Sequence, residues 1–363
     1  MKLSESQIYA IEYIKNYAKT HKKDSLDSIK HILEMSNISF DSFDYSISQL
    51  KNHGKVAIHF HPDRLDSNFK SVAENLLEQG IYKSQFETLI SNGSVSAYHG
   101  GERDLWENEL FGGAYNKIEH SQRPKYGAFD LMLHPDGAAP RFGSCYFLLN
   151  SNVSQRCTFT YMDSHQKPNE KGTLDEFDYI LSALLTEIFT RNYALGKYNL
   201  TVPKFINHLS TKLSKPYSDP YKKSTSHNIN HYIEAQIHGD INLKNDVNKL
   251  VADPSFKGTN IGLFFNKICE KYNIELYWHC GFALSINKVP DNFRGSKMPF
   301  LAKRITSKDY IDTTMLGVAA SELKNAPEQW NSFGTYEEVI QQIKLLWHIL
   351  VKYGKPLKEF KNN

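Results

Sequence analysis

The amino-acid sequence predicts an α+β protein, with helical segments at both ends of the chain around a core of short β runs and glycine-rich loops. Residues 3–50 repeat apolar side chains at spacings of three and four, as a helix buried on one face does. Residues 55–61 and 231–243 read as β runs, and the second alternates between apolar and polar side chains. Helical periodicity returns after residue 246. Together these patterns favour one α+β core with helical additions.

Size and composition agree with such a core. The chain has 363 residues, of which 40% are hydrophobic and 13% aromatic, so it can bury a large apolar interior. We expect a helical N-terminal segment at 1–52, an α+β catalytic core at 53–245 and a mainly helical C-terminal region at 246–363 packed on that core. The net charge of +3 provides no strong field for nucleic acid or an anionic membrane.

Several classes of protein are disfavoured by what the sequence lacks. The four cysteines form no CxxC pair, which argues against a structural zinc site and a thioredoxin-type site and suits a reducing compartment. The N-terminus has no apolar signal-peptide core, and no apolar run approaches the roughly 18 residues of a membrane span. Neither GxGxxG, a Walker A sequence nor GxSxG is present. We therefore expect a cytoplasmic protein without membrane partners, with signal-independent secretion as an effector left open.

The first elements of the core have clear boundaries. Residues 55–61 form a strand that Pro62 ends. Residues 68–79 form a helix, and Gly80 stands where a glycine commonly ends one. Residues 91–143 are dense in glycine and proline, as loops that build binding sites often are.

The next elements alternate between β runs, a helix and a loop. Residues 144–149 and 157–162 are two β runs joined by a polar segment, which predicts a hairpin. Residues 174–193 are predicted to be helical, and 208–228 a polar loop that contains the basic stretch KPYSDPYKK at 215–223.

His59, His61 and Asp63 are candidate ligands in the stretch KVAIHFHPDRL. Residues i and i+2 of a strand share a face, and neutral imidazole binds zinc or iron, so a metal site is one interpretation. A second is that the histidines are hydrogen-bonded inside a β core. The third, which we favour, is that they border a pocket for an organic ligand, with no metal.

Glu234 and Gln236 share one face of the predicted strand at 231–243, opposite Ile233, Ala235 and Ile237. A carboxylate placed there can stabilise an oxocarbenium-like transition state, as in glycosyl transfer. The alternative is a solvent-facing edge strand with ordinary polar residues.

Two loop sequences place a cation beside an aromatic ring. Arg123 lies near Tyr126, and Arg141 precedes Phe142. Arginine can bind a diphosphate through two hydrogen bonds, and aromatic rings stack on planar groups. Either loop could equally be a turn with a packed aromatic residue.

Long stretches of the chain, covering about residues 50–355, resemble a bacterial family catalogued only as a domain of unknown function. The stretches that carry this likeness are HFHPDR (59–64), GIYKSQFETLISNG (80–93), GGERDLWENELFGGAY (100–115), RPKYGAFDL (123–131), PRFGSCYFLL (140–149), EAQIHGDI (234–241), DPSFKGT (253–259), HCGFAL (279–284) and KLLWHILVKYG (344–354). The family resemblance implies no activity.

A second resemblance does imply one. The strand IHFHPDR followed by the helix VAENLLEQG is similar to the start of ADP-ribosyltransferases. The resemblance implies a split-sheet core and a chain that consumes NAD. In that family the first strand offers a His or Arg to NAD, which here would be His59 or His61, with Arg64 behind. A middle element offers a Tyr or Ser, which would be Tyr126, and a late strand offers the catalytic carboxylate, which would be Glu234.

The other candidate NAD contacts are Arg123, Arg141, Phe142 and Gln236. The chain departs from the usual pattern in two places: HFH replaces HGT or HxT, and Glu-x-Gln replaces Glu-x-Glu, so the acceptor stays open. The expected function is cleavage of NAD with transfer of ADP-ribose to an unknown acceptor. A protein is the favoured acceptor, and a nucleic acid is the second option. The alternatives are a metal-dependent hydrolase that uses His59, His61 and Asp63, and a binding or effector module without catalysis.

Overall fold

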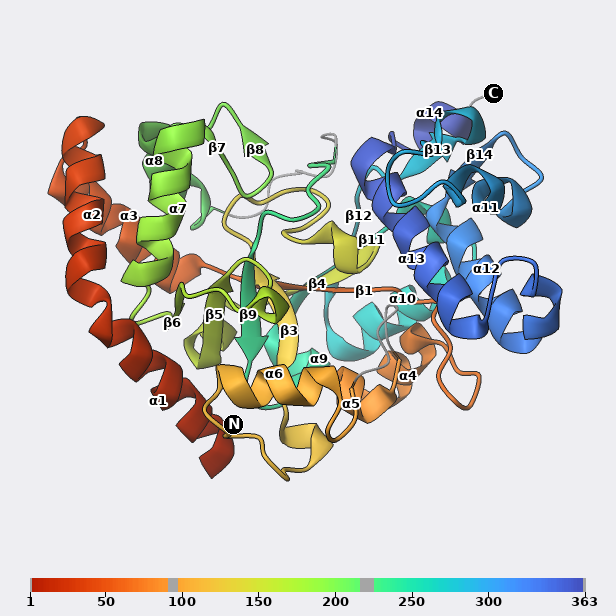
Figure 1. Cartoon of the computed structure of the whole chain (residues 1–363), viewed down its shortest axis with the longest axis horizontal. Helices are drawn as coiled ribbons and strands as arrows, with labels where there is room; N and C mark the ends of the chain where they lie inside the picture. The colour runs from red at the N-terminus through yellow and green to blue at the C-terminus, as the bar shows by residue number, and fades with distance from the viewer. Residues whose placement is uncertain (1, 91–96, 216–224, 362–363) are drawn as a thin grey trace.

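The computed structural model describes residues 2–90, 97–215 and 225–361 as a mixed α+β protein built on an eight-stranded sheet (Figure 1). The strand order is β12-β11-β4-β1-β3-β9-β5-β6, and neighbours are antiparallel except β11 with β12. The strands are β1 (Val56–Phe60), β3 (Lys125–Phe129), β4 (Cys145–Leu149), β5 (Cys157–Tyr161), β6 (Lys171–Thr173), β9 (Ile233–Ile237), β11 (Val247–Ala252) and β12 (Glu275–Trp278).

The described part of the chain also contains three two-stranded ribbons, fourteen α-helices and several short 3₁₀ helices. The ribbons are β2 (Ile81–Tyr82) with β10 (Ile241–Asn242), β7 (Tyr193–Ala194) with β8 (Lys197–Tyr198), and β13 (Ala283–Ser285) with β14 (Tyr310–Asp312). The helices are α1 (Glu5–Thr20), α2 (Lys22–Met35), α3 (Phe40–His53), α4 (Val72–Gln79), α5 (Gln85–Thr88), α6 (Glu102–Leu110), α7 (Asp178–Arg191), α8 (Val202–Lys212), α9 (Leu243–Asp246), α10 (Asn260–Tyr272), α11 (Met298–Ile305), α12 (Thr313–Asn325), α13 (Tyr336–Tyr353) and α14 (Lys358–Lys361).

The two faces of the sheet differ in chemistry because alternate side chains of a strand point to opposite sides. On β9, Ile233, Ala235 and Ile237 enter the main apolar core with side chains from α2, α3, α7, α8 and α10. Glu234 and Gln236 lie on the other face, which carries the site described below. The alternation predicted for this strand is confirmed.

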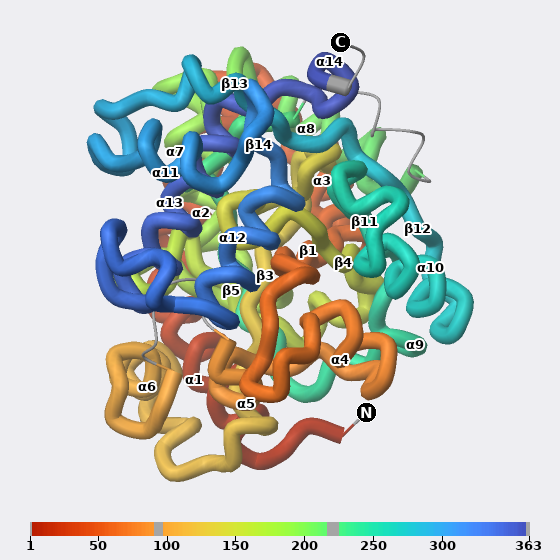
Figure 2. Tube along the Cα trace, turned by 90° about the vertical axis from the view of Figure 1, so that its right-hand side faces the viewer, coloured from red at the N-terminus to blue at the C-terminus, as the bar shows by residue number. Residues whose placement is uncertain are grey.

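The C-terminal helices form a second apolar core. Side chains of α11, α12 and α13 pack together in it, and Trp330 and Trp347 are fully buried there. Figure 1 places these helices at the end of the molecule opposite α1 and α2. In Figures 1 and 2, α6 and α13 lie on one side of the sheet and α10 on the other. The site therefore lies on the side of the sheet that α6 and α13 cover.

The helices predicted at both ends of the chain, the strand at 55–61 and the helix before Gly80 are confirmed. Gly80 ends α4 with φ of 66°, a conformation that glycine adopts without steric cost. The helix α8 enters the segment predicted as a polar loop and reaches Lys212. Most of the basic stretch at 215–223 lies outside the described residues.

The predicted hairpin of β4 and β5 is wrong. In the sheet β4 pairs with β1 and β11, whereas β5 pairs with β9 and β6. The polar segment between them forms a 3₁₀ helix over Ser151–Arg156, in which the Ser154 hydroxyl donates to the Gly54 carbonyl at 2.9 Å. The connection therefore crosses the end of the sheet instead of making a tight turn.

The sheet also continues past residue 245, where we expected the core to end. The strands β11 and β12 add two positions at one edge of the sheet, and α10 packs into the same apolar core. The split-sheet arrangement of an ADP-ribosyltransferase-like core stays a prediction. Within the described residues, no helix combines the length and the apolar content that a bilayer crossing requires.

Candidate functional site

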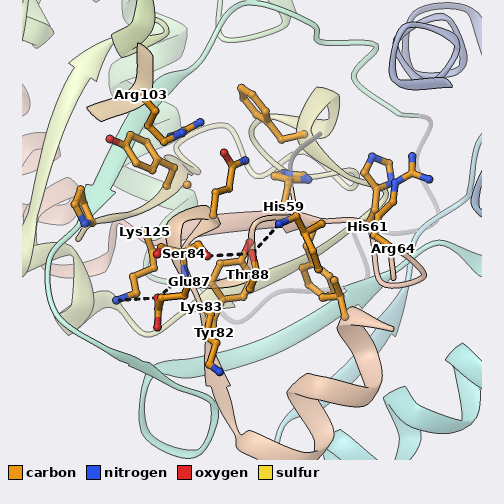
Figure 3. Close-up of a pocket in the computed structure, with 18 of the residues that line it drawn as sticks. His59, His61, Arg64, Tyr82, Lys83, Ser84, Glu87, Thr88, Arg103 and Lys125 are labelled. Carbon is orange, nitrogen blue, oxygen red and sulfur yellow. Dashed lines mark hydrogen bonds and ion pairs between the residues drawn. The ribbon is translucent and has the colours of Figure 1, made fainter. Parts of the chain in front are cut away.

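A cavity of about 580 Å³ opens on the polar face of the sheet, within the size range of small-molecule sites. Side chains from the sheet, the segments around α4 and α5, α6 and α13 line it. Figure 3 shows His61 and Arg64 at one side of this pocket and Arg103 at the opposite side. Seven of the predicted site residues line the cavity: His59, His61, Arg64, Tyr126, Arg141, Phe142 and Glu234.

Glu234 reaches the cavity from the middle of β9, and only 6% of its surface is exposed. Its neighbours across the sheet are Ala128 on β3 and Thr160 on β5, whose small side chains leave space above the strands. Burial, followed by the charge of Asp163, raises the pKa of Glu234 to about 7, and the side chains of Ser164, Gln236 and Arg103 oppose the shift. Glu234 can therefore exchange a proton near neutral pH.

Gln236 positions the Glu234 side chain through a hydrogen bond and does not itself line the cavity. Its amide nitrogen donates to Glu234 Oε1 at 3.0 Å and to the Thr160 hydroxyl at 3.2 Å. Its amide oxygen accepts from the Thr158 hydroxyl at 2.9 Å. The predicted contact between Gln236 and NAD is thus replaced by a positioning role, because the amide is fully used inside the sheet.

Tyr126, Arg103 and Trp106 form one wall of the cavity. Tyr126 lies on β3 opposite Gln236, and its hydroxyl donates to Glu107 Oε1 at 2.8 Å. The guanidinium carbon of Arg103 lies 4.4 Å from the centre of the Trp106 ring and 5.0 Å from that of Tyr126. Cation and rings together offer a surface for a planar group.

Arg123 lies behind this wall, so its predicted role in ligand binding is not supported. The side chain is 1% exposed and pairs with Asp104 and with Glu107, the latter at 2.9 Å. Both acids belong to α6, one turn apart. Arg123 therefore ties α6 to the start of β3, and it does not line the cavity.

His59 is held by the backbone at both ring nitrogens. Nδ1 donates to the Gly143 carbonyl at 3.1 Å, and Nε2 accepts from the Ala139 N–H at 3.2 Å. Burial lowers the pKa of His59 to about 3, which keeps the ring neutral. Gly137, with φ of 78°, passes so close that a Cβ would lie 2.5 Å from Nε2. His59 thus fixes the segment that carries Arg141 and Phe142, with no ring nitrogen left for a ligand.

The three residues of the metal alternative are not brought together. His59 is engaged as described, and the Asp63 carboxylate packs against Gly317 of α12, where a Cβ would lie 1.6 Å from Oδ2. Burial raises the pKa of Asp63 to about 6. His61 lines the cavity and packs edge-on against Trp347 at 5.3 Å between ring centres. Among the described residues, no group of three His, Cys, Asp or Glu side chains is suited to a metal ion.

Sequence reasoning missed four lining residues that matter for the chemistry: Arg103, Trp106, Asp163 and Lys344. Arg103 and Trp106 are three residues apart on α6, so a shared helix face was the signal available. Lys344 belongs to α13, in the region that the sequence predicts only to be helical and packed on the core. Nothing local to Asp163 in the sequence indicates its position beside Glu234.

The comparison with family models identifies the chain. Residues 55–353 match the model of the family described as "Protein of unknown function (DUF3626)", which covers most of the chain and includes every strand of the central sheet. No curated protein matches the sequence. The match begins before β1 and ends at the last residue of α13, so every residue that lines the cavity falls inside it. The chain belongs to the DUF3626 family.

Proposed function

We propose that this protein is an NAD-consuming enzyme of the ADP-ribosyltransferase type, which cleaves the bond between nicotinamide and ribose and transfers ADP-ribose to an acceptor. The observation that carries the proposal is Glu234: a buried carboxylate, oriented by Gln236, at the floor of a cavity of about 580 Å³. The strands that carry His59, Tyr126 and Glu234 are neighbours in the order β1-β3-β9. This adjacency supports the likeness to an ADP-ribosyltransferase core.

The chemistry requires a carboxylate near the ribose carbon. The bond to the positively charged nicotinamide breaks with its electron pair going to the ring nitrogen, so the leaving group needs no acid. The ribose becomes an oxocarbenium-like cation, which an ionised Glu234 stabilises electrostatically. Because the bound nicotinamide is itself cationic, its charge favours ionisation of Glu234 whose pKa is about 7 in the free protein.

The remaining lining residues have roles that fit a dinucleotide. The wall of Arg103, Trp106 and Tyr126 offers a surface for a planar ring, and Trp106 Nε1 has no hydrogen-bond partner among the described residues. Phe142 adds another aromatic ring to the lining. His59 acts indirectly by holding residues 139–143. The ADP-ribose acceptor is a protein side chain in this proposal, and water would give NAD hydrolysis instead.

The first test is binding. Isothermal titration of the purified protein with NAD, beside elemental analysis of the same sample, should give one-to-one binding without stoichiometric metal. A matched pair of variants, Trp106→Ala in the wall and Trp330→Phe in the C-terminal core, separates loss of the site from loss of packing. Stoichiometric metal with no NAD binding would overturn the proposal.

A further inference from the structure

We propose that the C-terminal helix α13 completes a subsite for a diphosphate group, formed by Lys344 with Arg64 and Arg141 in the lining of the cavity. The inference rests on the proposed function for the identity of the ligand, an ADP-containing dinucleotide. The subsite itself requires only a nucleoside diphosphate. Three separate segments of the chain contribute its cations: the β1–α4 connection, the turn at Pro140–Phe142 and α13.

The buried guanidinium of Arg64 is the observation that most directly indicates a bound anion. Only 8% of the residue is exposed, it lines the cavity, and its buried Nη1 has no hydrogen-bond partner within the described residues. Burial lowers the pKa of Arg64, and the charge of Asp63 only partly compensates. A buried cationic donor without an acceptor is costly, and a phosphate oxygen is the acceptor that a guanidinium binds best.

Lys344 adds a second cation without a counter-ion. In the part of the chain that the structure describes, no carboxylate lies within ion-pair distance of its ammonium group. Burial, together with repulsion by Arg141, Arg103 and Arg294, lowers the pKa of Lys344 to about 8, against attraction by Asp163. Cations gathered in this way repel one another, and a bound anion relieves that repulsion.

Arg141 lies on the turn that His59 fixes. Its Nη1 donates to the Asn230 side-chain oxygen at 3.0 Å, a neutral partner, and its Nε has no partner among the described residues. The full positive charge of Arg141 is therefore available to an anion beside Lys344.

Trp347 locks the three segments together. Its indole N–H donates to the Pro140 carbonyl at 2.9 Å, and its ring packs on His61. Because Trp347 lies one turn from Lys344 on α13, docking of the helix positions Lys344 against the segments of Arg64 and Arg141 at once. The cations are thus preorganised before a ligand binds.

Asp163 also lines the cavity. Its charge acts on the pKa of Glu234 and on that of Lys344, so the carboxylate and the cation belong to one shared lining. A dinucleotide with its nicotinamide ribose at Glu234 would then extend its diphosphate toward Lys344. A cavity of about 580 Å³ has the size of a small-molecule site and suits a free nucleotide.

The test is titration of the full-length protein with ADP, adenosine and inorganic pyrophosphate, using wild type, Lys344→Gln and Arg64→Gln. Lys352→Gln, an exposed lysine of the same helix, is the matched control. We expect each of the first two variants to weaken ADP binding at least tenfold, with adenosine affinity unchanged and the control equal to wild type. Circular dichroism checks folding, and Lys344→Gln suffices if Arg64→Gln unfolds.

Two results would overturn the subsite: wild type that binds neither ADP nor pyrophosphate, or Lys344→Gln that binds ADP as wild type does. Failure of the proposed function is distinguishable. ADP binding that depends on Lys344, without any release of nicotinamide from NAD, would keep the subsite and remove the enzyme. Release of nicotinamide from NAD, with a KM for NAD that is unchanged in Lys344→Gln, would keep the enzyme and remove the subsite.

Discussion

The amide of Gln236 donates to Glu234 Oε1 at 3.0 Å, at the end of a directed chain of buried hydrogen bonds. Tyr115 donates to His238 Nδ1 at 2.5 Å, and His238 Nε2 lies 3.0 Å from the Thr158 hydroxyl, which donates to Gln236. Because the Thr158 hydroxyl uses its hydrogen on the Gln236 oxygen, it accepts from His238, which therefore carries its proton on Nε2. The Gln236 amide then presents its N–H to Glu234. The orientation of the carboxylate is thus determined inside the sheet.

Gln236→Met should raise the pKa of Glu234, because the substitution removes a hydrogen bond that favours the ionised carboxylate. The kcat/KM for NAD in the wild type should rise with pH through an apparent pKa near 7, the value for the free protein. In the variant we expect this midpoint to move to higher pH by about one unit. A pH profile that keeps its midpoint while the rate falls would assign Gln236 a merely structural role.

Replacing Glu234 with glutamine should stabilise the protein at alkaline pH relative to wild type. The folded-state pKa of about 7 lies above the ordinary 4.5, so the folded wild type holds its proton more tightly and loses stability as pH rises through this window. Between pH 4 and pH 8 the difference in unfolding free energy should change by on the order of 3 kcal/mol in favour of Glu234→Gln. Urea unfolding at both pH values measures it, and a constant difference would refute the raised pKa.

Tyr126→Phe should lower the free energy of unfolding by about 1–3 kcal/mol, because buried Glu107 Oε1 loses the donor that now lies at 2.8 Å. The ring itself remains, so NAD affinity should stay within a few-fold of wild type. Tyr9→Phe, at an exposed site on α1, is the control for stability. Loss of NAD binding in Tyr126→Phe would show that the hydroxyl, rather than the ring, contacts the ligand.

Acid should unfold this protein readily. Burial lowers the pKa of His59 and His238 to about 3 and that of His61 well below its usual value. Depressed histidine pKa values give stability that is present above about pH 6.5 and is lost as pH falls toward the folded-state values. Thermal melting between pH 7.5 and pH 4.5 should show a steep loss of Tm, with His238→Gln less sensitive than wild type. Equal sensitivity would contradict a neutral, buried His238.

The sequence predicted what depends on local periodicity. The alternation around Glu234 placed the carboxylate on the correct face of β9, and His59 and His61 border a cavity, as the favoured interpretation of HFHPDR predicted. The misassigned residues depended on distant partners. Arg123 looked free beside Tyr126 because nothing marks two acids of α6 as its partners.

Distant contacts also explain the other differences. The nitrogens of His59 are satisfied by backbone groups some 80 residues later in the chain, which no local pattern reveals. In the sequence, Lys344 is one polar residue of a C-terminal helix. In the structure, Trp347 of the same helix binds the Pro140 carbonyl, and Lys344 lines the cavity. Its role depends on tertiary packing alone.

The most direct test is the release of nicotinamide from NAD, followed by chromatography, for wild type, Glu234→Gln and the control Glu109→Gln. Glu109 is an exposed acid of α6 paired with Lys167, so its replacement leaves the cavity unchanged. The proposal predicts release by wild type and the control, and a loss of at least about 10²-fold in Glu234→Gln with the fold intact. Release that persists in Glu234→Gln, or none from wild type that binds NAD, would contradict it.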